Sequence, residues 1–299
     1  MRQNTFSTRS LDRLGRLRKD SAALAEQLAG GRPLVIPLAG DRIAVRSDGD
    51  RAAIVTVEMA EAADVDLWLL GRIDGTVYAA VDLGDDPAAR DDLAPDVRWS
   101  GLREVAGLLN ADDANLLATA TGLAVWHRTH RYCGACGAPT TADWSGHRRR
   151  CDSCGREHFP RTDPAIIVLV THDDRALLAR NPAWPPGFSS VLAGFVEPGE
   201  SLEDAVSREV MEEVGLPVEA VAYQSSQPWP FPSSIMLGFR AEAAHDDLDP
   251  DPEEIADARF YSRKELADGV TALPPPMSIA RRLLDDWLAG TGTPTEPVD

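Results

Sequence analysis

The first part of the chain alternates short apolar runs with Gly, Asp and Pro, which is the pattern of a strand meander. Apolar residues then take helical spacing from Leu102 to Arg128, so one or two helices are expected to close the region. No catalytic cluster is visible here, and the pattern predicts a β-rich structural or dimerising domain over residues 1–127. The predicted strands are 34–38, 53–57, 67–70 and 77–81.

A second pattern begins beyond Pro160. The run from Ala165 to Val170 is uniformly apolar, as in a strand that is buried on both faces. Residues 175–180 are its expected hairpin partner. Further periodic stretches predict helices at about 201–214 and 277–288, a strand at 235–243 and an acidic loop at 246–254. Strands around one central helix indicate an α+β sandwich over 161–290, followed by a disordered Pro/Thr-rich tail at 291–299.

Composition narrows the possible partners. The 30 Lys and Arg residues against 48 Asp and Glu residues give a net charge of −18. Such a surface repels polyanions and disfavours broad nucleic-acid binding, whereas bound divalent cations can still admit a small phosphorylated substrate. The chain has no apolar run of membrane-spanning length, and its arginine-rich N-terminus lacks the apolar segment of a secretion signal. We therefore expect a cytoplasmic protein without membrane contact.

All four cysteines lie in two Cys-x-x-Cys pairs, a spacing that can turn four sulfurs toward one tetrahedral ion. The clustering also suits a reducing compartment better than a disulfide framework. Gly134, Gly137 and Gly155 are expected to relieve the tight turns. Because four thiolates leave no open position on the ion, the pattern predicts one structural Zn²⁺ in a ribbon at 128–160. Its ligands are Cys133, Cys136, Cys151 and Cys154.

Basic side chains surround the cysteines. His147 and His158 are surplus to the zinc ligands and are expected to face solvent. The run Arg148–Arg150 lies between the two cysteine pairs, and zinc ribbons often bind nucleic acid. Because the chain is so acidic, we favour a basic loop that offsets local acidity or contacts the neighbouring domain.

The segment from Gly194 to Leu216 carries the clearest chemistry. Ser201 is a good N-cap, Asp204 can complete a capping box, and Gly215 ends the helix. Glutamates at positions 209, 212 and 213 crowd one helical face, and like charges at this spacing destabilise a bare helix. Hard divalent cations with oxygen-rich shells would remove the repulsion.

This segment also resembles the Nudix box without departure. The matching positions are Gly194, Glu200, Arg208, Glu209, Val210, Glu212, Glu213, Gly215 and Leu216. The resemblance implies a loop and helix that bind Mg²⁺ or Mn²⁺ and hydrolyse a nucleoside diphosphate linked to another group.

A proline-rich loop follows the box, with the sequence Ser226-Gln-Pro-Trp-Pro-Phe-Pro-Ser-Ser234. Its prolines favour an extended, rigid chain, Trp229 and Phe231 can offer ring faces to a base, and Gln227 and the serines can hydrogen-bond its substituents. The loop resembles the array that follows the box in NADH pyrophosphatases of the Nudix superfamily, which also carry a zinc ribbon upstream. The resemblance covers residues 102–284, and it implies a Nudix α/β/α sandwich with a β-rich N-terminal domain and a small zinc ribbon between them.

The resemblance further implies the site residues. Two or three Mg²⁺ or Mn²⁺ ions would bind the main-chain carbonyl of Ala193 and the carboxylates of Glu209, Glu213 and Glu254, with Glu253 as an alternative to Glu254. Glu212 or Glu254 would accept a proton from the attacking water. Substrate contacts would come from Arg103, Phe159, Phe195, Gln227, Pro228, Trp229, Pro230, Phe231, Pro232, Ser233, Ser234 and Ala280. The family commonly has Tyr where this chain has Phe159, a change that keeps ring stacking but removes a hydroxyl.

The function that the resemblance implies is hydrolysis of the pyrophosphate of NAD(H) to AMP and nicotinamide mononucleotide by a homodimer. Removal of NAD caps from RNA 5′ ends by the same chemistry is the close alternative. A Nudix enzyme that acts on ADP-ribose or oxidised nucleotides fits the box but leaves the 226–234 loop unexplained. A nucleotide-sensing zinc-ribbon regulator would be expected to lose box glutamates, and this chain loses none.

Overall fold

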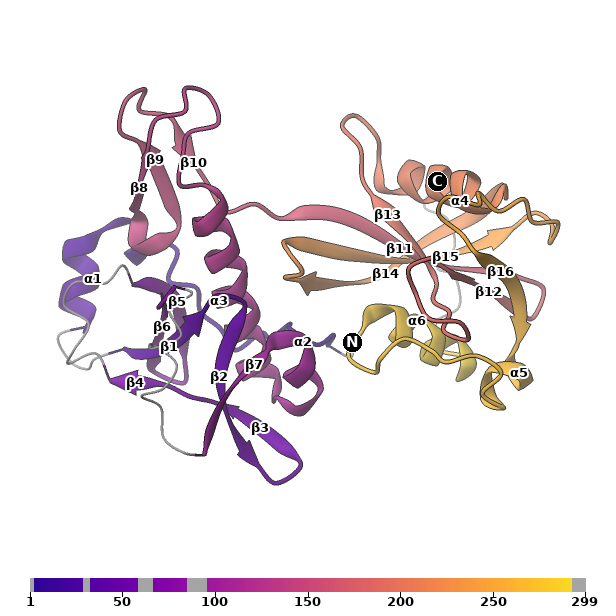
Figure 1. Cartoon of the computed structure of the whole chain (residues 1–299), viewed down its shortest axis with the longest axis horizontal. Coiled ribbons are helices and arrows are strands. Elements are labelled where there is room, and N and C mark those ends of the chain that lie inside the picture. The colour runs from indigo at the N-terminus through magenta and orange to yellow at the C-terminus, as the bar shows by residue number, and fades with distance from the viewer. Residues whose placement is uncertain (1–2, 29–32, 59–66, 85–95, 292–299) are drawn as a thin grey trace. The chain divides into compact units, whose positions relative to one another are not determined.

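The computed structural model describes residues 3–28, 33–58, 67–84 and 96–291 (Figure 1). Contacts divide the chain into two compact units. The first comprises residues 3–162 together with the short segment 229–233, and the second comprises 163–228 and the chain from Ser234 onward. Apart from Thr291, the predicted disordered tail lies outside the described residues. Within the described part, no helix is long and apolar enough to span a membrane.

The first unit is built on a seven-stranded sheet with the order β3-β2-β1-β6-β5, to which β4 adds beside β1 and β7 beside β2. Strands β1 and β6 run parallel. The strands are β1 (Leu34–Ala39), β2 (Arg42–Asp48), β3 (Arg51–Ile54), β4 (Val57–Glu58), β5 (Trp68–Ile73), β6 (Thr76–Asp82) and β7 (Val97–Gly101). The helices are η1 (Leu17–Lys19), α1 (Ser21–Leu28), α2 (Leu102–Val105), η4 (Ala106–Leu108) and α3 (Ala111–Thr129).

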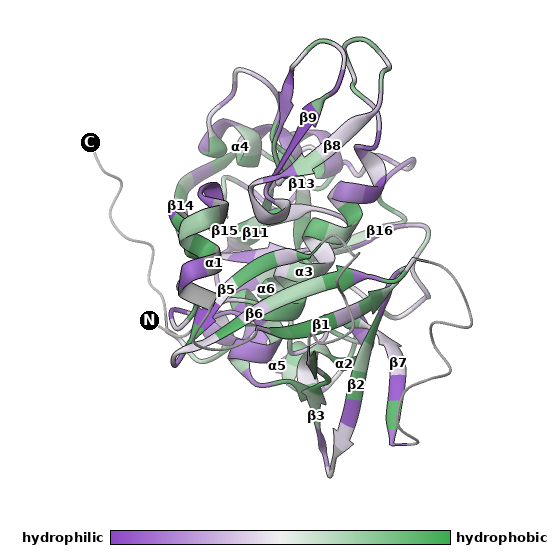
Figure 2. Cartoon of the chain, turned by 90° about the vertical axis from the view of Figure 1, so that its left-hand side faces the viewer, coloured by the Kyte–Doolittle hydropathy of each residue, from purple (hydrophilic) through white to green (hydrophobic). Residues whose placement is uncertain are grey.

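Helix α3 supplies most of the helical packing on this sheet. It begins at Asn110, whose side chain accepts a hydrogen bond from the Asp113 N–H at 2.8 Å. Its buried side chains, Leu116, Leu117 and Trp126 among them, pack toward β1, β5 and β6. Figure 2 shows apolar residues concentrated along these three strands. The predicted strands and closing helix are confirmed for this unit, but the predicted meander is wrong, because β1 pairs in parallel with β6 and consecutive strands do not all pair with one another.

Two strands of the first sheet were not predicted. In β2 the buried Ile43, Ala44 and Val45 are flanked by charged residues, and β7 has only a short mixed sequence. The predicted strand 53–57 is divided between β3 and β4.

The cysteine-rich segment forms a separate three-stranded sheet with the order β10-β9-β8. Its elements are β8 (Thr140–Asp143), η5 (Trp144–Gly146), β9 (Arg148–Cys151) and β10 (Glu157–His158). Both cysteine pairs lie in the turns at one end of this sheet, as the loops above β8, β9 and β10 in Figure 1 show.

The second unit contains a six-stranded mixed sheet with the order β14-β15-β11-β12-β16, and β13 pairs with β11. Strand β11 runs parallel to β15 and antiparallel to β12 and β13. The elements are β11 (Asp163–His172), β12 (Arg175–Arg180), β13 (Leu192–Phe195), α4 (Leu202–Val214), β14 (Val218–Trp229), β15 (Ser234–Ala243), β16 (Asp257–Ser262), α5 (Arg263–Ala267) and α6 (Ile279–Leu288). The predicted strands and both predicted helices are confirmed, and so is the β11–β12 hairpin.

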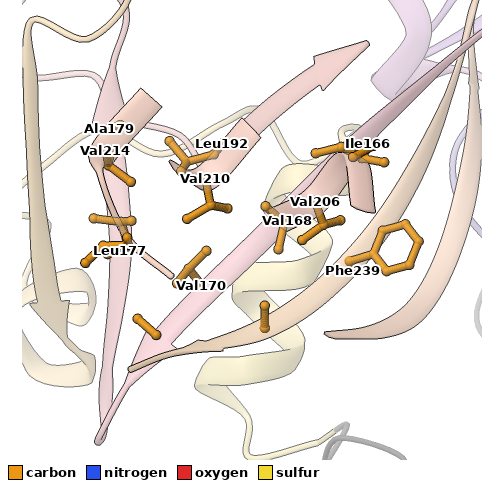
Figure 3. Close-up of a cluster of buried hydrophobic side chains, with 14 of the residues drawn as sticks. Ile166, Val168, Val170, Leu177, Ala179, Leu192, Val206, Val210, Val214 and Phe239 are labelled. Carbon is orange, nitrogen blue, oxygen red and sulfur yellow. The ribbon is translucent and has the colours of Figure 1, made fainter. Parts of the chain in front are cut away.

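Alternation along β11 explains why the sheet has a helix on each face. Ile166, Val168 and Val170 point into one apolar cluster with the buried face of α4 (Figure 3). Ile167 and Leu169 point into a second cluster with α6. Burial of each such side chain contributes about 1.5–3 kcal/mol to the free energy of unfolding. The unit is thus an α/β/α sandwich, and its core holds β13 and α4, the elements of the Nudix box, in place.

Candidate active site

The turn between β13 and α4 is fixed by local hydrogen bonds. The Ser201 hydroxyl oxygen accepts from the Asp204 N–H at 3.1 Å, and the Asp204 carboxylate accepts from the Ser201 hydroxyl at 2.7 Å. At the other end of α4, Gly215 is left-handed with φ +68 and donates its N–H to the Met211 carbonyl at 3.0 Å. The predicted caps are confirmed, so the start and end of the acidic helix follow directly from the sequence.

Arg208 connects the loop to the acidic face of the helix. Its guanidinium donates to Glu200 at 2.7 and 3.0 Å, to Glu209 at 2.9 Å and to Glu212 at 3.0 Å. It also donates to the Phe195 carbonyl oxygen at 2.8 Å. The hydrogen bonds from Arg208 lower the pKa of Glu200 to about 2. Arg208 therefore holds three carboxylates and the end of β13 in one arrangement.

Glu209 packs directly on Gly194. A Cβ atom built on this glycine would lie 1.8 Å from the Glu209 carboxyl carbon and about as close to both of its oxygens. Side-chain exposure is low for Glu209, and this burial is the main cause that raises its pKa. The box glycine is thus needed for the space it leaves free, since its φ is not in the left-handed region.

Glu213 is the most perturbed carboxylate of the described residues. Burial, followed by the charges of Glu209, Glu254 and Glu212, raises its pKa to about 8. Its Oε2 atom is buried and has no hydrogen-bond partner among the described residues. A buried carboxylate oxygen that has no donor, and whose carboxyl pKa is raised by three other glutamates, suits a divalent cation such as Mg²⁺ or Mn²⁺, although the oxygens of these carboxylates do not all lie within 4.8 Å of one another.

The acidic loop is held against the end of α4 by main-chain hydrogen bonds. The Asp249 N–H donates to the Val214 carbonyl and the Asp251 N–H to the Glu213 carbonyl, both at 3.0 Å. Glu254 follows on this loop, and its charge raises the pKa of both Glu209 and Glu213. Glu253 is not among the main causes of either shift. Placement therefore favours Glu254 over Glu253 as the fourth carboxylate.

The other residues predicted beside the box lie on β13. Ala193 is exposed and pairs with Ile167 of β11. The Phe195 ring is 60% exposed at the end of the strand, so it is available to stack on a base.

The proline-rich loop is a continuation of β14 followed by a tight turn at 230–233 into β15. The rings of Trp229 and Phe231 meet edge to face with centroids 5.0 Å apart. The Arg103 guanidinium carbon lies 4.4 Å from the Phe231 centroid and 5.5 Å from that of Trp229. Trp229, Phe231 and Arg103 thus form one cluster within the first unit. Of the other residues in the proline-rich segment, Pro232 is exposed, Pro228 and Ser233 are half-buried, and Pro230 and Ser234 are buried.

Gln227, near the end of β14, and Ala280, in α6, are both buried. Gln227 is fully buried, its Nε2 donates to the Met277 carbonyl, and its Oε1 accepts from the Ile279 N–H, both at 2.8 Å. Its amide holds the end of β14 to the start of α6, so this placement does not support a hydrogen bond to a substrate base. The Ala280 methyl group lies inside the α6 core cluster, which leaves only its main chain for a contact.

Phe159 lies just after β10 in the first unit. Its ring is 52% exposed, and its centroid is 5.9 Å from that of Trp144. The exposed ring face agrees with a stacking role.

The four cysteines come together as predicted. Their sulfurs all lie within 4.8 Å of one another, with Cys133 and Cys154 3.8 Å apart and Cys136 and Cys151 3.5 Å apart. The Cys154 N–H donates to the Cys151 sulfur, the main cause that lowers the pKa of Cys151 to about 6. A favoured thiolate among four converging sulfurs fits one structural Zn²⁺.

Three details of the ribbon differ from expectation, and the first is His158, which is half-buried with its Nε2 atom shielded from solvent. Gly137 and Gly155 are left-handed, with φ +73 and +72, but Gly134 does not have a positive φ. His147 is not a solvent-facing residue, because its Nε2 contacts the Leu69 carbonyl at 2.6 Å and its Nδ1 the Arg18 guanidinium at 2.9 Å. Burial lowers the pKa of His147 to about 4.

Two residues of the basic run, Arg148 and Arg149, contact neighbouring residues of the ribbon. Arg148 pairs with Asp143 and Glu157, and Arg149 donates to Thr140. These contacts agree with the interpretation that the run offsets local acidity.

Both units match known protein families. Residues 161–287 match the NUDIX domain, 24–126 the NADH pyrophosphatase-like rudimentary NUDIX domain, and 128–159 the NADH pyrophosphatase zinc ribbon domain. "NAD-capped RNA hydrolase NudC" of Stutzerimonas stutzeri (strain A1501) is 45% identical over 229 residues, which are 77% of this chain and 80% of that protein. The protein of the same name from Pseudomonas putida (strain GB-1) is 38% identical over 282 residues, 93% of this chain and 97% of that one.

The chain belongs to the NADH pyrophosphatase-like Nudix hydrolases with a zinc ribbon. A solved NUDIX hydrolase from Nitrosomonas europaea aligns over 54% of this chain and 94% of its own, with 22% identity and a TM-score of 0.45.

As a Nudix hydrolase, the protein is a pyrophosphohydrolase that uses Mg²⁺ or Mn²⁺, and its ribbon suits a structural zinc. The carboxylates of the Nudix box were identified from the sequence. Arg208 was identified only as a residue that matches the box, and its contacts with Glu200, Glu209 and β13 were not predicted. In the sequence, the contact between Arg208 and Glu200 is indicated only by their spacing of eight residues. The two side chains can meet only if the loop folds back on the helix.

The close packing of Glu209 on Gly194 leads to a prediction. Gly194→Ala should lower kcat/KM of this Nudix hydrolase by about 10²-fold or more, because the new methyl group displaces the Glu209 carboxylate by an ångström or so. Steady-state kinetics measures the loss. Gly122→Ala is the control, since a Cβ atom at this helical position meets nothing within 4 Å. Parent activity of Gly194→Ala would show that Glu209 need not occupy this place.

Proposed function

We propose that this Nudix hydrolase cleaves the pyrophosphate of NAD(H) to AMP and nicotinamide mononucleotide. The observation that carries the proposal is the carboxylate cluster around the buried, undonated Oε2 of Glu213. Support for the dinucleotide comes from the Trp229–Phe231–Arg103 cluster and from the exposed ring of Phe195, since both offer stacking surfaces for bases.

Glu209, Glu213 and Glu254, with the Ala193 carbonyl, are the groups we propose to hold the divalent cations. When bound, these cations neutralise the diphosphate and make a bound water more acidic. Arg208 keeps the Glu209 carboxylate oriented through its 2.9 Å hydrogen bond. Glu212 has a side chain that is 59% exposed, and we propose that it or Glu254 accepts the proton of the attacking water.

Product analysis tests this function. Purified, zinc-loaded protein is incubated with NADH and Mn²⁺ or Mg²⁺, with and without chelator. We expect equal amounts of AMP and reduced nicotinamide mononucleotide, and no products when the chelator is present. Faster hydrolysis of ADP-ribose or oxidised nucleotides than of NADH would contradict the proposed substrate.

NAD-capped RNA is the second candidate substrate, because the relatives at 38–45% identity carry the name NAD-capped RNA hydrolase. The net charge of −18 disfavours strong binding to an RNA backbone. Turnover of free NADH and of an NAD-capped oligonucleotide is compared over a range of salt concentrations. If the RNA body contributes affinity, KM for the capped oligonucleotide alone should rise with salt.

We also propose that the protein is a cytoplasmic homodimer. A zinc site of four reduced thiols suits a reducing compartment, and the β-rich first unit has enough apolar strand to form an interface. Light scattering at several protein concentrations measures the molar mass and so tests the dimer. Cell fractionation tests whether the protein is in the cytoplasm.

A further inference from the structure

Phe6 lies against the aromatic residues of the 229–233 turn, although more than two hundred positions separate them in the chain. Its ring is fully buried. The ring centroids lie 6.3 Å from Trp229 and 5.9 Å from Phe231, with interplanar angles of 68° and 66°. Phe6 therefore meets both rings edge to face, the preferred arrangement for aromatic pairs.

The backbone at Phe6 is held in an uncommon conformation. Its φ of +69 lies in the left-handed region, which is unfavourable for a residue with a Cβ atom. Two contacts with α3 fix the surrounding segment. The Asn115 side-chain amide donates to the Phe6 carbonyl at 2.5 Å, and the Thr8 hydroxyl donates to Asp112 at 2.5 Å. The ring of Phe6 thus belongs to a short turn that hydrogen bonds hold against α3.

Arg103 supports the same turn from α2. Its guanidinium lies over the Phe231 ring, and all these residues belong to the first unit. The two aromatic residues proposed to bind the substrate are therefore placed by residues that are remote in sequence, in addition to strand β14 and the turn that follows it.

We propose that Phe6 is a positioning residue for substrate binding, which acts by fixing the orientation of Trp229 and Phe231. The inference rests on the proposed NAD(H) hydrolysis. Loss of the Phe6 ring would leave the carboxylate cluster unchanged but would allow the rings of Trp229 and Phe231 to reorient. Binding should weaken while the chemical step is retained.

The test uses Phe6→Leu in the full-length, zinc-loaded protein with NADH and Mn²⁺. We expect KM to rise about three- to tenfold with kcat within about twofold of the parent value, the size expected for lost edge-to-face contacts. Leu14→Ala is the matched control, because Leu14 lies in the same N-terminal segment and is also buried and left-handed, with φ +50. This control should lower the unfolding temperature without raising KM.

A double-mutant cycle separates positioning from general stability. If Phe6 acts through Phe231, Phe6→Leu should raise KM much less in a Phe231→Leu background than in the parent protein. Equal effects in both backgrounds would overturn the proposal. So would an unchanged KM in a folded Phe6→Leu variant, or an equal rise in Leu14→Ala.

Hydrogen exchange provides a readout that does not depend on substitution at Phe6. The Glu213→Gln variant is mixed with NADH and Mn²⁺, and bound NADH is expected to order residues 229–233. Because coupling between two sites is reciprocal, amide exchange at residues 4–8 should then slow as well. Exchange that slows at 229–233 but not at 4–8 would overturn the proposal. Failure of the proposed function is distinguishable, since the parent protein itself would then not hydrolyse NADH.

Discussion

Glu213→Gln should reduce kcat/KM for NADH by about 10³-fold or more, because the change removes the charge of a central carboxylate and keeps its shape. The expected loss lies mainly in kcat, measured at saturating Mn²⁺. Glu203→Gln is the matched control, since Glu203 is an exposed residue in the first turn of the same helix. Turnover of Glu213→Gln at the parent rate would show that this carboxylate is not part of the metal site.

The same variant should respond to pH in a defined direction. The pKa of Glu213 is raised from 4.5 to about 8 in the folded protein. The folded state therefore binds a proton that the unfolded state has lost, and stability falls as pH rises from the lower to the higher of these values. Above about pH 8 and with chelator present, Glu213→Gln should unfold several degrees above the parent. Added Mn²⁺ should stabilise the parent and remove this difference, and a parent that stays the more stable protein in chelator would contradict the assignment.

Cys151→Ser should abolish zinc binding and lower the unfolding temperature of the first unit by about 10 °C or more, because a structural zinc site contributes directly to folding. Cys151 is buried, and its sulfur accepts the Cys154 N–H, so a hydroxyl in its place supplies a weak ligand where a thiolate is favoured. A zinc-binding dye and calorimetry measure the two effects.

Ser153→Ala is the control for the zinc site, as Ser153 is exposed in the same cysteine turn. It should retain one zinc per chain. A Cys151→Ser variant with full zinc content and an unchanged unfolding temperature would rule out the four-cysteine site.

Features with a local cause were predictable from the sequence. Ser201, Asp204 and Gly215 set the limits of α4 through hydrogen bonds that span three or four residues. Each cysteine pair lies in its own tight turn, which turns its two sulfurs the same way, and the pairing of β8, β9 and β10 then brings the two turns together. The sandwich followed from apolar strands on either side of one amphipathic helix.

Features that depend on distant contacts were not predictable. Gln227 appears in the sequence as a polar loop residue, but β14 extends through it and buries its amide against the start of α6. His147 appears free until Leu69 and Arg18 are brought beside it. No contact of Phe6 could be predicted from the sequence, because a single aromatic residue near the N-terminus is not part of a helical or strand pattern. In each case tertiary packing decided the role of the side chain.

The placement of residues 229–233 has a consequence for how this polypeptide can be divided. Because this turn belongs to the first unit while its flanking strands belong to the second, the chain passes between the two units three times. A fragment that starts at Asp163 would lose the packing partners of Trp229 and Phe231 and expose both rings, so it should be prone to aggregation. Residues 229–233 and the N-terminal residues that pack on them are therefore expected to be inherited together, and recombination that replaces one should require matching changes in the other.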